Sequence, residues 1–317
     1  MLWLLLLSLM PAPDPGRYIL DSFSDALIVA VGENHGHVEL HRLILDVLRR
    51  PEAPGLIDDI AVEWGNSHYQ PLADRYIGGY PVPEDSLSLI WRNTVVSPNT
   101  VWDAPVYEAF FHAVRDINQT LPDTVRYRVL LADSPVIWER VDSREDLQGF
   151  FDRAKIMADV IRTQSLRKGR RSLFLAGGLH VSRVPRRHVG RTGVPFGEIT
   201  PVAWIELFHP GSTRSIASMG RASELDLPEL VGTGPPLLVE LSESEPLSRV
   251  PANATTTLRS SDGKLLDVYP RKVLADLVHA VTLWDPSEVT LQEAPSPAGA
   301  YARELERRRR ILQGSGR

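Results

Sequence analysis

An apolar run that stops abruptly at charged and imidazole side chains constrains this chain more than any other feature. Residues 26–31 read Ala-Leu-Ile-Val-Ala-Val, which is typical of a strand buried on both faces of a parallel sheet. Gly32 follows, and Glu33 and His35 come directly after it. Because an unpartnered buried carboxylate or imidazole is costly, these side chains belong at a strand end, near solvent or a ligand. Residues 38–50 then carry apolar side chains at helical spacing, so the stretch predicts a strand, a loop and a helix.

Three further segments share this design of an apolar run with an ionisable residue near its end. They are residues 60–66 with Glu63, residues 129–135 with Asp133, and residues 173–180 with His180. Helical patterns separate them, as a parallel sheet with crossover helices requires. We therefore expect an α/β fold with three α/β/α layers, a mainly parallel central sheet and a site at the carboxyl ends of the strands.

The remaining elements are expected from periodicity and turn signals. Helices are expected at residues 67–76, 85–92, 105–121 and 143–164, the last capped by Ser143 with Asp146 three residues on. Later strands are expected at residues 201–208, 236–241 and 281–284.

Composition excludes several classes of protein. The 317 residues include 43% hydrophobic and 24% charged residues, as in an ordinary globular protein. The formal net charge of -5 gives no support to a nucleic-acid partner. The absence of cysteine excludes disulfides, thiolate metal sites and cysteine nucleophiles.

The two ends of the chain differ from its centre. Residues 1–10 are apolar but too short to span a bilayer, which takes roughly 20 residues, and no other stretch is a candidate membrane helix. They predict a signal peptide over residues 1–16 and export to the periplasm or the medium; the missing Lys or Arg before the apolar segment leaves a cytoplasmic location as the alternative. Residues 17–290 are expected to form one domain. Residues 291–317 are expected to form a charged tail whose arginines face water.

The ionisable residues at the expected strand ends predict chemistry. Glu33, His35, Glu63 and His180 are the candidate catalytic residues, because imidazoles oriented by carboxylates transfer protons near neutral pH. The alternative is a divalent metal held by His35, His180 and Glu63. The candidate substrate-binding residues are Asn66, Asp133, Arg153 and Arg183. Asp133 has the alternative of only starting a turn, and Arg153 that of facing water.

Two neighbouring patterns each have two interpretations. His37 and His41 have the i, i+4 spacing of some zinc sites, but without a flanking Glu we expect a polar helix face. Residues 181–191 carry four arginines and are expected to form a loop. This loop is either a lid that attracts an anionic substrate or a haem propionate, or a solvated connection. The chain has no Gly-x-Ser-x-Gly elbow, P-loop or dinucleotide fingerprint.

Two Gly-x-x-His motifs carry a family resemblance. Residues 32–35 (Gly-Glu-Asn-His) and 177–180 (Gly-Gly-Leu-His) resemble motifs of the superfamily that joins erythromycin esterases, ChaN-type haem-binding proteins and Tiki/TraB proteases. Glu63 lies where that superfamily carries an acid, and residues 152–158 resemble its Arg-containing, Met-Ala segment. The similarity covers residues 25–183 and is closest to an uncharacterised bacterial branch. It departs from the esterases at Asn34, where their pattern has a small polar residue.

The resemblance implies a three-layer α/β fold with a site across the strand ends. As an enzyme, the protein is expected to be a hydrolase in which His35 activates water, Glu33 or Glu63 orients that imidazole, and His180 stabilises charge or protonates the leaving group. The alternative is a haem- or metal-binding protein of the ChaN type without catalytic activity. The expected partner is a small-molecule substrate or haem.

Overall fold

The computed structural model describes residues 14–184, 186–189, 195–220, 236–241, 248, 257–259, 265–267 and 273–314. Residues 1–13, most of the predicted signal peptide, lie outside the described residues. Within the described part of the chain, no helix is both long and apolar enough to cross a membrane.

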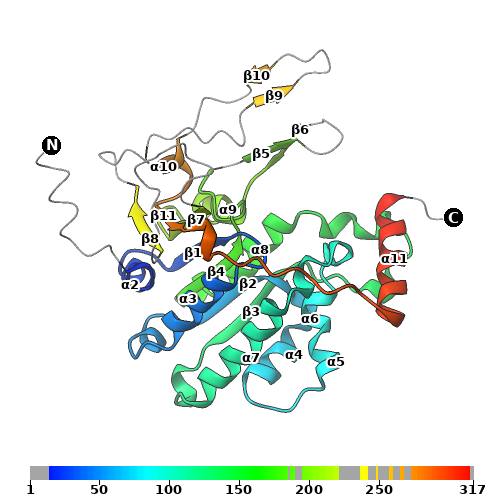
Figure 1. The fold of residues 1–317 in the computed structure, drawn as a ribbon, viewed down its shortest axis with the longest axis horizontal. Helices are drawn as coiled ribbons and strands as arrows, with labels where there is room; N and C mark the ends of the chain where they lie inside the picture. The colour runs from blue at the N-terminus through cyan, green and yellow to red at the C-terminus, as the bar shows by residue number, and fades with distance from the viewer. Residues whose placement is uncertain are drawn as a thin grey trace, which may run out of the picture.

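A seven-stranded sheet forms the centre of the molecule (Figure 1). Its strands, in sheet order, are β3 (Arg128–Asp133), β2 (Asp59–Asn66), β4 (Ser172–Gly177), β1 (Ile28–Glu33), β7 (Thr213–Gly220), β11 (Ala280–Trp284) and β8 (Leu237–Glu240). Neighbouring strands pair in parallel except β8, which is antiparallel to β11. The predicted mainly parallel sheet is confirmed. Two short antiparallel pairs lie apart from it: β5 (Arg186–Val189) with β6 (Pro195–Glu198), and β9 (Thr257–Arg259) with β10 (Leu265–Asp267).

Helices cover both faces of the sheet. The principal helices are α2 (Pro15–Asp21), α3 (Val38–Leu48), α4 (Gln70–Ile77), α5 (Glu84–Leu87), α6 (Leu89–Arg92), α7 (Pro105–Gln119), α8 (Arg153–Gln164), α9 (Pro201–Phe208), α10 (Leu274–Leu277) and α11 (Gly299–Gln313). Odd-numbered β1 residues such as Val29 and Val31 join the core of α3, α4, α6 and α7. Their neighbours Ile28 and Ala30 join the core of α8, α9 and α10. Alternation of side chains along each strand thus builds the expected three layers.

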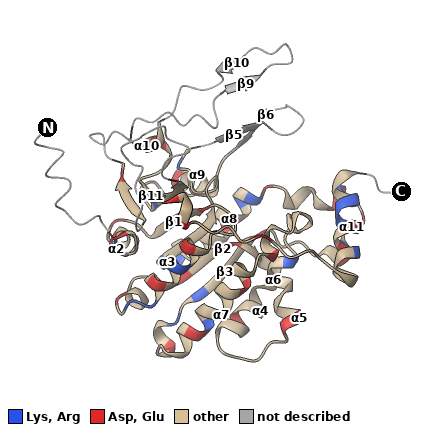
Figure 2. Ribbon diagram, viewed as in Figure 1, with Lys and Arg blue, Asp and Glu red and all other residues tan. Residues whose placement is uncertain are grey.

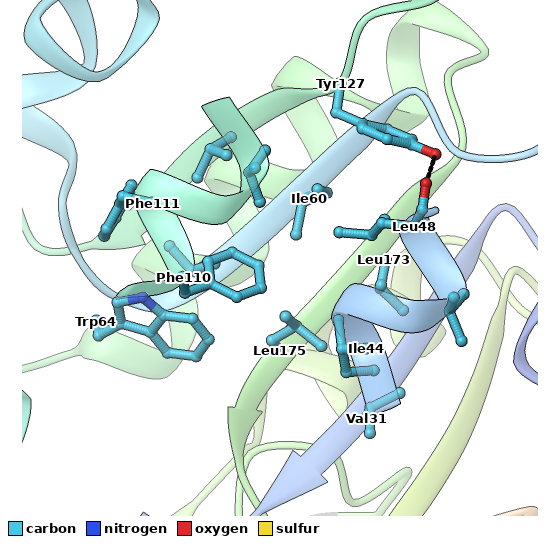
Figure 3. Close-up of a cluster of buried hydrophobic side chains, with 14 of the residues drawn as sticks. Val31, Ile44, Leu48, Ile60, Trp64, Phe110, Phe111, Tyr127, Leu173 and Leu175 are labelled. Atoms are coloured by element: carbon cyan, nitrogen blue, oxygen red, sulfur yellow. Dashed lines mark hydrogen bonds between the residues drawn. The ribbon is translucent and has the colours of Figure 1, made fainter. Parts of the chain in front are cut away.

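The larger core lies between the sheet and helices α3 and α7 (Figure 3). Phe110 and Phe111 of α7 and Ile44 of α3 pack there, and each is at most 1% exposed. The hydroxyl of Tyr127 reaches across this core and donates to the carbonyl of Leu48 at 2.8 Å, which fixes the end of α3 against the start of β3. This packing makes the helix after β1 a rigid support for the loop between them.

Two expected elements are wrong. Residues 201–208 were expected as a strand but form α9, which begins at Pro201 with Thr200 as its N-cap. A short apolar run does not distinguish a strand from a buried helix by periodicity alone. The expected helix over residues 143–164 is interrupted: a 3-10 segment, Glu145–Phe150, precedes α8, and Asp152 rather than Ser143 caps it.

The segment after residue 181 also differs from the expected loop. Arg186–Val189 forms strand β5, paired with β6. Residues 185 and 190–191 of the expected loop lie outside the described residues. A further strand, β7, was not expected at all, because Ser215 and Ser218 interrupt any apolar run although both are buried.

The C-terminal segment is packed rather than fully solvated. The chain leaves β11 and runs to α11 past the loop that follows β1, where the amide of Gln292 donates to the carbonyl of Gly36 (Figure 1). Basic residues are frequent along α11 (Figure 2), yet Arg308 is only 3% exposed. Its guanidinium donates to the Arg92 carbonyl and to Asn93 Oδ1, each at 2.7 Å. The solvated interpretation of this arginine run is therefore wrong for Arg308, because backbone and side-chain oxygens solvate the buried cation.

Candidate functional site

Four adjacent strands bring the candidate residues to one edge of the sheet. Glu33 ends β1, Glu63 lies in β2 beside a register shift, Asp133 ends β3, and Gly177 ends β4. Glu33 pairs in register with Gly177, and both β1 and β2 flank β4. The carboxyl ends of these strands therefore meet, as the apolar runs predicted.

Glu33 is the centre of the first group. Its Oε1 lies 3.1 Å from His35 Nδ1 and accepts a hydrogen bond from the Tyr107 hydroxyl at 2.8 Å. Its Oε2 lies 2.8 Å from His41 Nε2. Burial opposes the charged form, but the hydrogen bonds from the two histidines outweigh it and hold the pKa of Glu33 below its usual value.

Glu63, on β2, is the centre of the second group. His180 Nε2 lies 3.0 Å and Arg153 Nη2 2.9 Å from its Oε1. The backbone amide of Gly177 donates to its Oε2 at 2.7 Å. Burial again opposes ionisation, but the charges and hydrogen bonds of His180 and Arg153 hold the pKa of Glu63 well below its usual value. This carboxylate is therefore ionised at neutral pH although it is almost fully buried.

Arg153 links Glu63 to Asp133. Its Nε donates to Asp133 Oδ1 at 2.8 Å, and its Nη2 also contacts Oδ2 at 3.1 Å. Burial raises the pKa of Asp133 despite this cation. The alternative of a solvent-facing Arg153 is excluded by this geometry, and Asp133 does more than start a turn, although it also accepts from the Ser134 amide.

His35 lies between the two groups. A Cβ added to Gly177 would lie 2.7 Å from His35 Cε1 and 3.3 Å from Glu63 Oε2, so the imidazole occupies the space that a side chain would take. The ring of Trp102 packs edge-on at 4.7 Å between centroids. Burial lowers the pKa of His35, but its bond to Glu33 and the charges of Glu63 and Glu33 raise it above the ordinary value. His35, whose side chain is 41% exposed, is the most accessible member of the group.

Sequence reasoning missed three aromatic or imidazole side chains of the site. The polar-face interpretation of His37 and His41 is wrong: both are buried, and His41 binds Glu33. His41 lies three and seven residues before Ile44 and Leu48 on the buried face of α3, and this spacing was a usable signal. Tyr107 and Trp102 gave no comparable signal, because their segments are remote from β1 in sequence.

Two candidate substrate-binding residues are occupied elsewhere. The Asn66 amide nitrogen donates to the carbonyls of Asn93 and Val136, each at 2.7 Å, and its Oδ1 accepts from the His68 amide. Asn66 therefore fixes the turn after β2. The Arg183 amide donates to the Leu277 carbonyl of α10. None of the contacts described for Arg183 joins it to the groups centred on Glu33 and Glu63.

The donor set does not fit the alternative of a divalent metal at His35, His180 and Glu63. Among the residues that the structure describes, no group of three or more His, Asp or Glu side chains is arranged to hold a metal ion. Both oxygens of Glu63 are engaged, and the Arg153 cation 2.9 Å away opposes a second positive charge. We therefore derive no metal-dependent step for these residues.

Comparison with known proteins gives a fold. No family model and no curated protein matches the sequence. The solved structures that are similar include a Bacillus cereus protein (TM-score 0.55, 10% identity, 88% of this chain and 93% of that chain). A succinoglycan biosynthesis protein is similar with a TM-score of 0.56 and 10% identity, over 85% of this chain and 90% of that chain. A histidine-to-asparagine mutant of the erythromycin esterase EreC in its open conformation is similar with a TM-score of 0.51 and 11% identity, over 89% of this chain and 95% of that chain. The chain has the erythromycin esterase fold. At these identities the likeness concerns the fold alone.

Proposed function

We propose that this protein hydrolyses an ester or amide bond with water that His35 activates. The observation that carries the proposal is a pair of histidines, each held by its own buried carboxylate, with His35 and the second carboxylate, Glu63, both beside Gly177. Two such pairs at one sheet edge provide a base and an acid for a single reaction. A purely structural cluster does not need two imidazoles within reach of solvent.

The protonation of Glu33 determines the role of His35. An ionised carboxylate only accepts hydrogen bonds, so His35 Nδ1 carries the proton that points to Glu33. In the neutral imidazole this leaves the lone pair on Nε2, which takes a proton from water as the hydroxide attacks the carbonyl carbon. Glu33 fixes the tautomer and stabilises the imidazolium that forms.

His180 completes the reaction. Its Nε2 carries the proton that points to the ionised Glu63. In the imidazolium form its Nδ1 therefore gives up the proton that the leaving alkoxide or amine takes when the tetrahedral intermediate breaks down. His35 then returns the proton it took to solvent water, and His180 regains one from it. Arg153 acts through Glu63 and Asp133 as a positioning residue. The esterase named among the similar folds supports a hydrolase, but it does not identify the substrate.

A panel of activated esters and anilides tests the proposal. His35→Gln and His180→Gln should each lower kcat/KM by about two orders of magnitude or more, the range of general acid–base catalysis. His68→Gln is the matched control: the contact described for this exposed side chain is a ring contact with Tyr69, the backbone bond to Asn66 is kept, and activity should be retained. If the wild type turns over no substrate but develops a Soret band when titrated with haem, a band that His35→Gln loses, the ChaN-type haem-binding alternative replaces the hydrolase.

A further inference from the structure

Three exposed apolar side chains border the charged site. Phe151, Leu179 and Leu291 are 43%, 46% and 52% exposed. They are among the eight large hydrophobic side chains that are exposed in the described part of the chain. Single exposed apolar residues are common, but three in segments that border one site need an explanation.

Each of the three lies in a segment that is tied to the strand ends of the site: Phe151 to the end of β3, Leu179, which follows β4, to the end of β1, and Leu291 to the loop after β1. The carbonyl of Phe150, next to Phe151, accepts from the Ser134 hydroxyl, one residue after Asp133. Leu179 lies in the turn between β4 and His180, where the Gly178 amide donates to the Glu33 carbonyl.

Leu291 belongs to the segment that leads to α11. It pairs with His37 across an isolated antiparallel bridge, and the next amide, that of Gln292, donates to the Gly36 carbonyl beside His35. Phe151, Leu179 and Leu291 therefore follow the strand order β3, β4, β1 along the edge of the sheet. We name these three residues the apolar rim.

We propose that the apolar rim binds an extended apolar group of the substrate, so that the protein prefers esters with long alkyl or acyl chains over short ones. This inference rests on the proposed hydrolase function. The rim spans three strand spacings, about 14 Å. That length suits a chain of many methylene groups, whereas a stable protein partner needs about 800 Å² of surface on each side.

A chain-length series of p-nitrophenyl esters, from acetate to decanoate, tests the inference on the full chain. We expect kcat/KM, corrected for the hydroxide-catalysed rate of each ester, to rise about twofold per added methylene, because each is partly removed from water. The triple variant Phe151→Ser, Leu179→Ser, Leu291→Ser should lower the decanoate-to-acetate ratio at least tenfold. Leu207→Ser is the control. This residue is 62% exposed, but it lies near the end of α9, just before the amino end of β7, whereas the site lies at the carboxyl ends of the strands.

The outcomes separate the two proposals. Ester turnover with a flat chain-length series, or a triple variant that keeps the wild-type ratio, overturns the apolar rim and leaves the hydrolase intact. If no ester is turned over, the hydrolase fails, and calorimetric binding of decanoate against acetate tests the rim instead. Tighter decanoate binding that the triple variant loses supports the rim, and equal binding of the two anions overturns it.

Discussion

The imidazole of His35 lies so close to Gly177 that a single added carbon would displace it: a Cβ at Gly177 would lie 2.7 Å from His35 Cε1. Gly177→Ala should therefore move His35 away from its hydrogen bond with Glu33, because this half-exposed side chain can rotate away. The buried Glu63 oxygen, 3.3 Å from the added carbon, must also shift by a few tenths of an ångström, so a moderate loss of stability is expected. We expect kcat/KM to fall about 100-fold, the cost of misplacing a catalytic group by about 1 Å. Ester turnover together with the melting temperature measures both effects.

Gly178→Ala is the matched control for this substitution. The nearest atom to a Cβ at Gly178 is the Glu33 carbonyl oxygen at 3.7 Å, an ordinary contact. Activity should therefore remain close to that of the wild type. If Gly177→Ala were as active as Gly178→Ala, the position of His35 against β4 would not matter for catalysis.

Much of the site's location could be predicted from the sequence, because the runs that end in Glu33, Asp133 and His180 are long and apolar. Runs of this kind form central parallel strands, and their carboxyl ends meet at one edge. The pairing of Arg153 with carboxylates was one of two alternatives that sequence left open, and the structure decides between them.

The rest depends on contacts between residues that are distant in sequence. Tyr107 reaches Glu33 across 74 positions of the chain, and its helix shows only an apolar stripe. Strand β7 contains buried serines, and their burial depends on the neighbouring strands rather than on their own hydrophobicity. The apolar run 201–208 is compatible with a strand or a helix, and the Thr200 side chain, which caps its first turn, favours the helix.

The acid limb of the pH–rate profile should report His35. Its pKa is raised above the ordinary histidine value of 6.5, so activity should be lost as the pH falls through that raised value, since protonation removes the lone pair needed to accept a proton from water. Glu33→Gln removes the charge that stabilises the imidazolium, so the limb should move to lower pH, and the maximal rate should fall. Glu39→Gln is the control, because the contacts described for Glu39 are with His37, Arg42 and Thr290. An unmoved limb in Glu33→Gln would remove His35 from the role of base.

Arg153 should contribute strongly to stability. Arg153→Met leaves Glu63 and Asp133 buried without their shared cation, which should cost about 3–5 kcal/mol in urea-induced unfolding at pH 7. Lys155→Met on the same helix removes only an exposed pair with Asp159 and should change stability by less than about 1 kcal/mol.

The pH dependence of unfolding checks the reason for that loss. In the wild type the pKa of Glu63 is well below 4.5, so this carboxylate contributes stability above that pH, and the contribution is lost as the pH falls through the folded-state value. In Arg153→Met the raised pKa of Asp133 should rise further, so the deficit relative to wild type should shrink as the pH is lowered from 7 toward 5. A deficit independent of pH would attribute the loss to packing instead.

Arg308 should anchor the C-terminal helix. Its guanidinium donates to the Arg92 carbonyl, to Asn93 Oδ1 and to Ser97 Oγ, and it lies 4.8 Å from the centre of the Trp138 ring. Arg308→Met removes the donors to three largely buried acceptors and should cost about 2–4 kcal/mol in urea-induced unfolding. Arg303→Met, an exposed position on the same helix, should cost less than about 0.5 kcal/mol.

Protease digestion adds a local readout, because cleavage after the arginines of α11 should become faster in Arg308→Met before the rest of the domain is cut. Equal cleavage in the two variants would mean that the apolar contacts of Leu305 and Ile311 hold the helix without this cation.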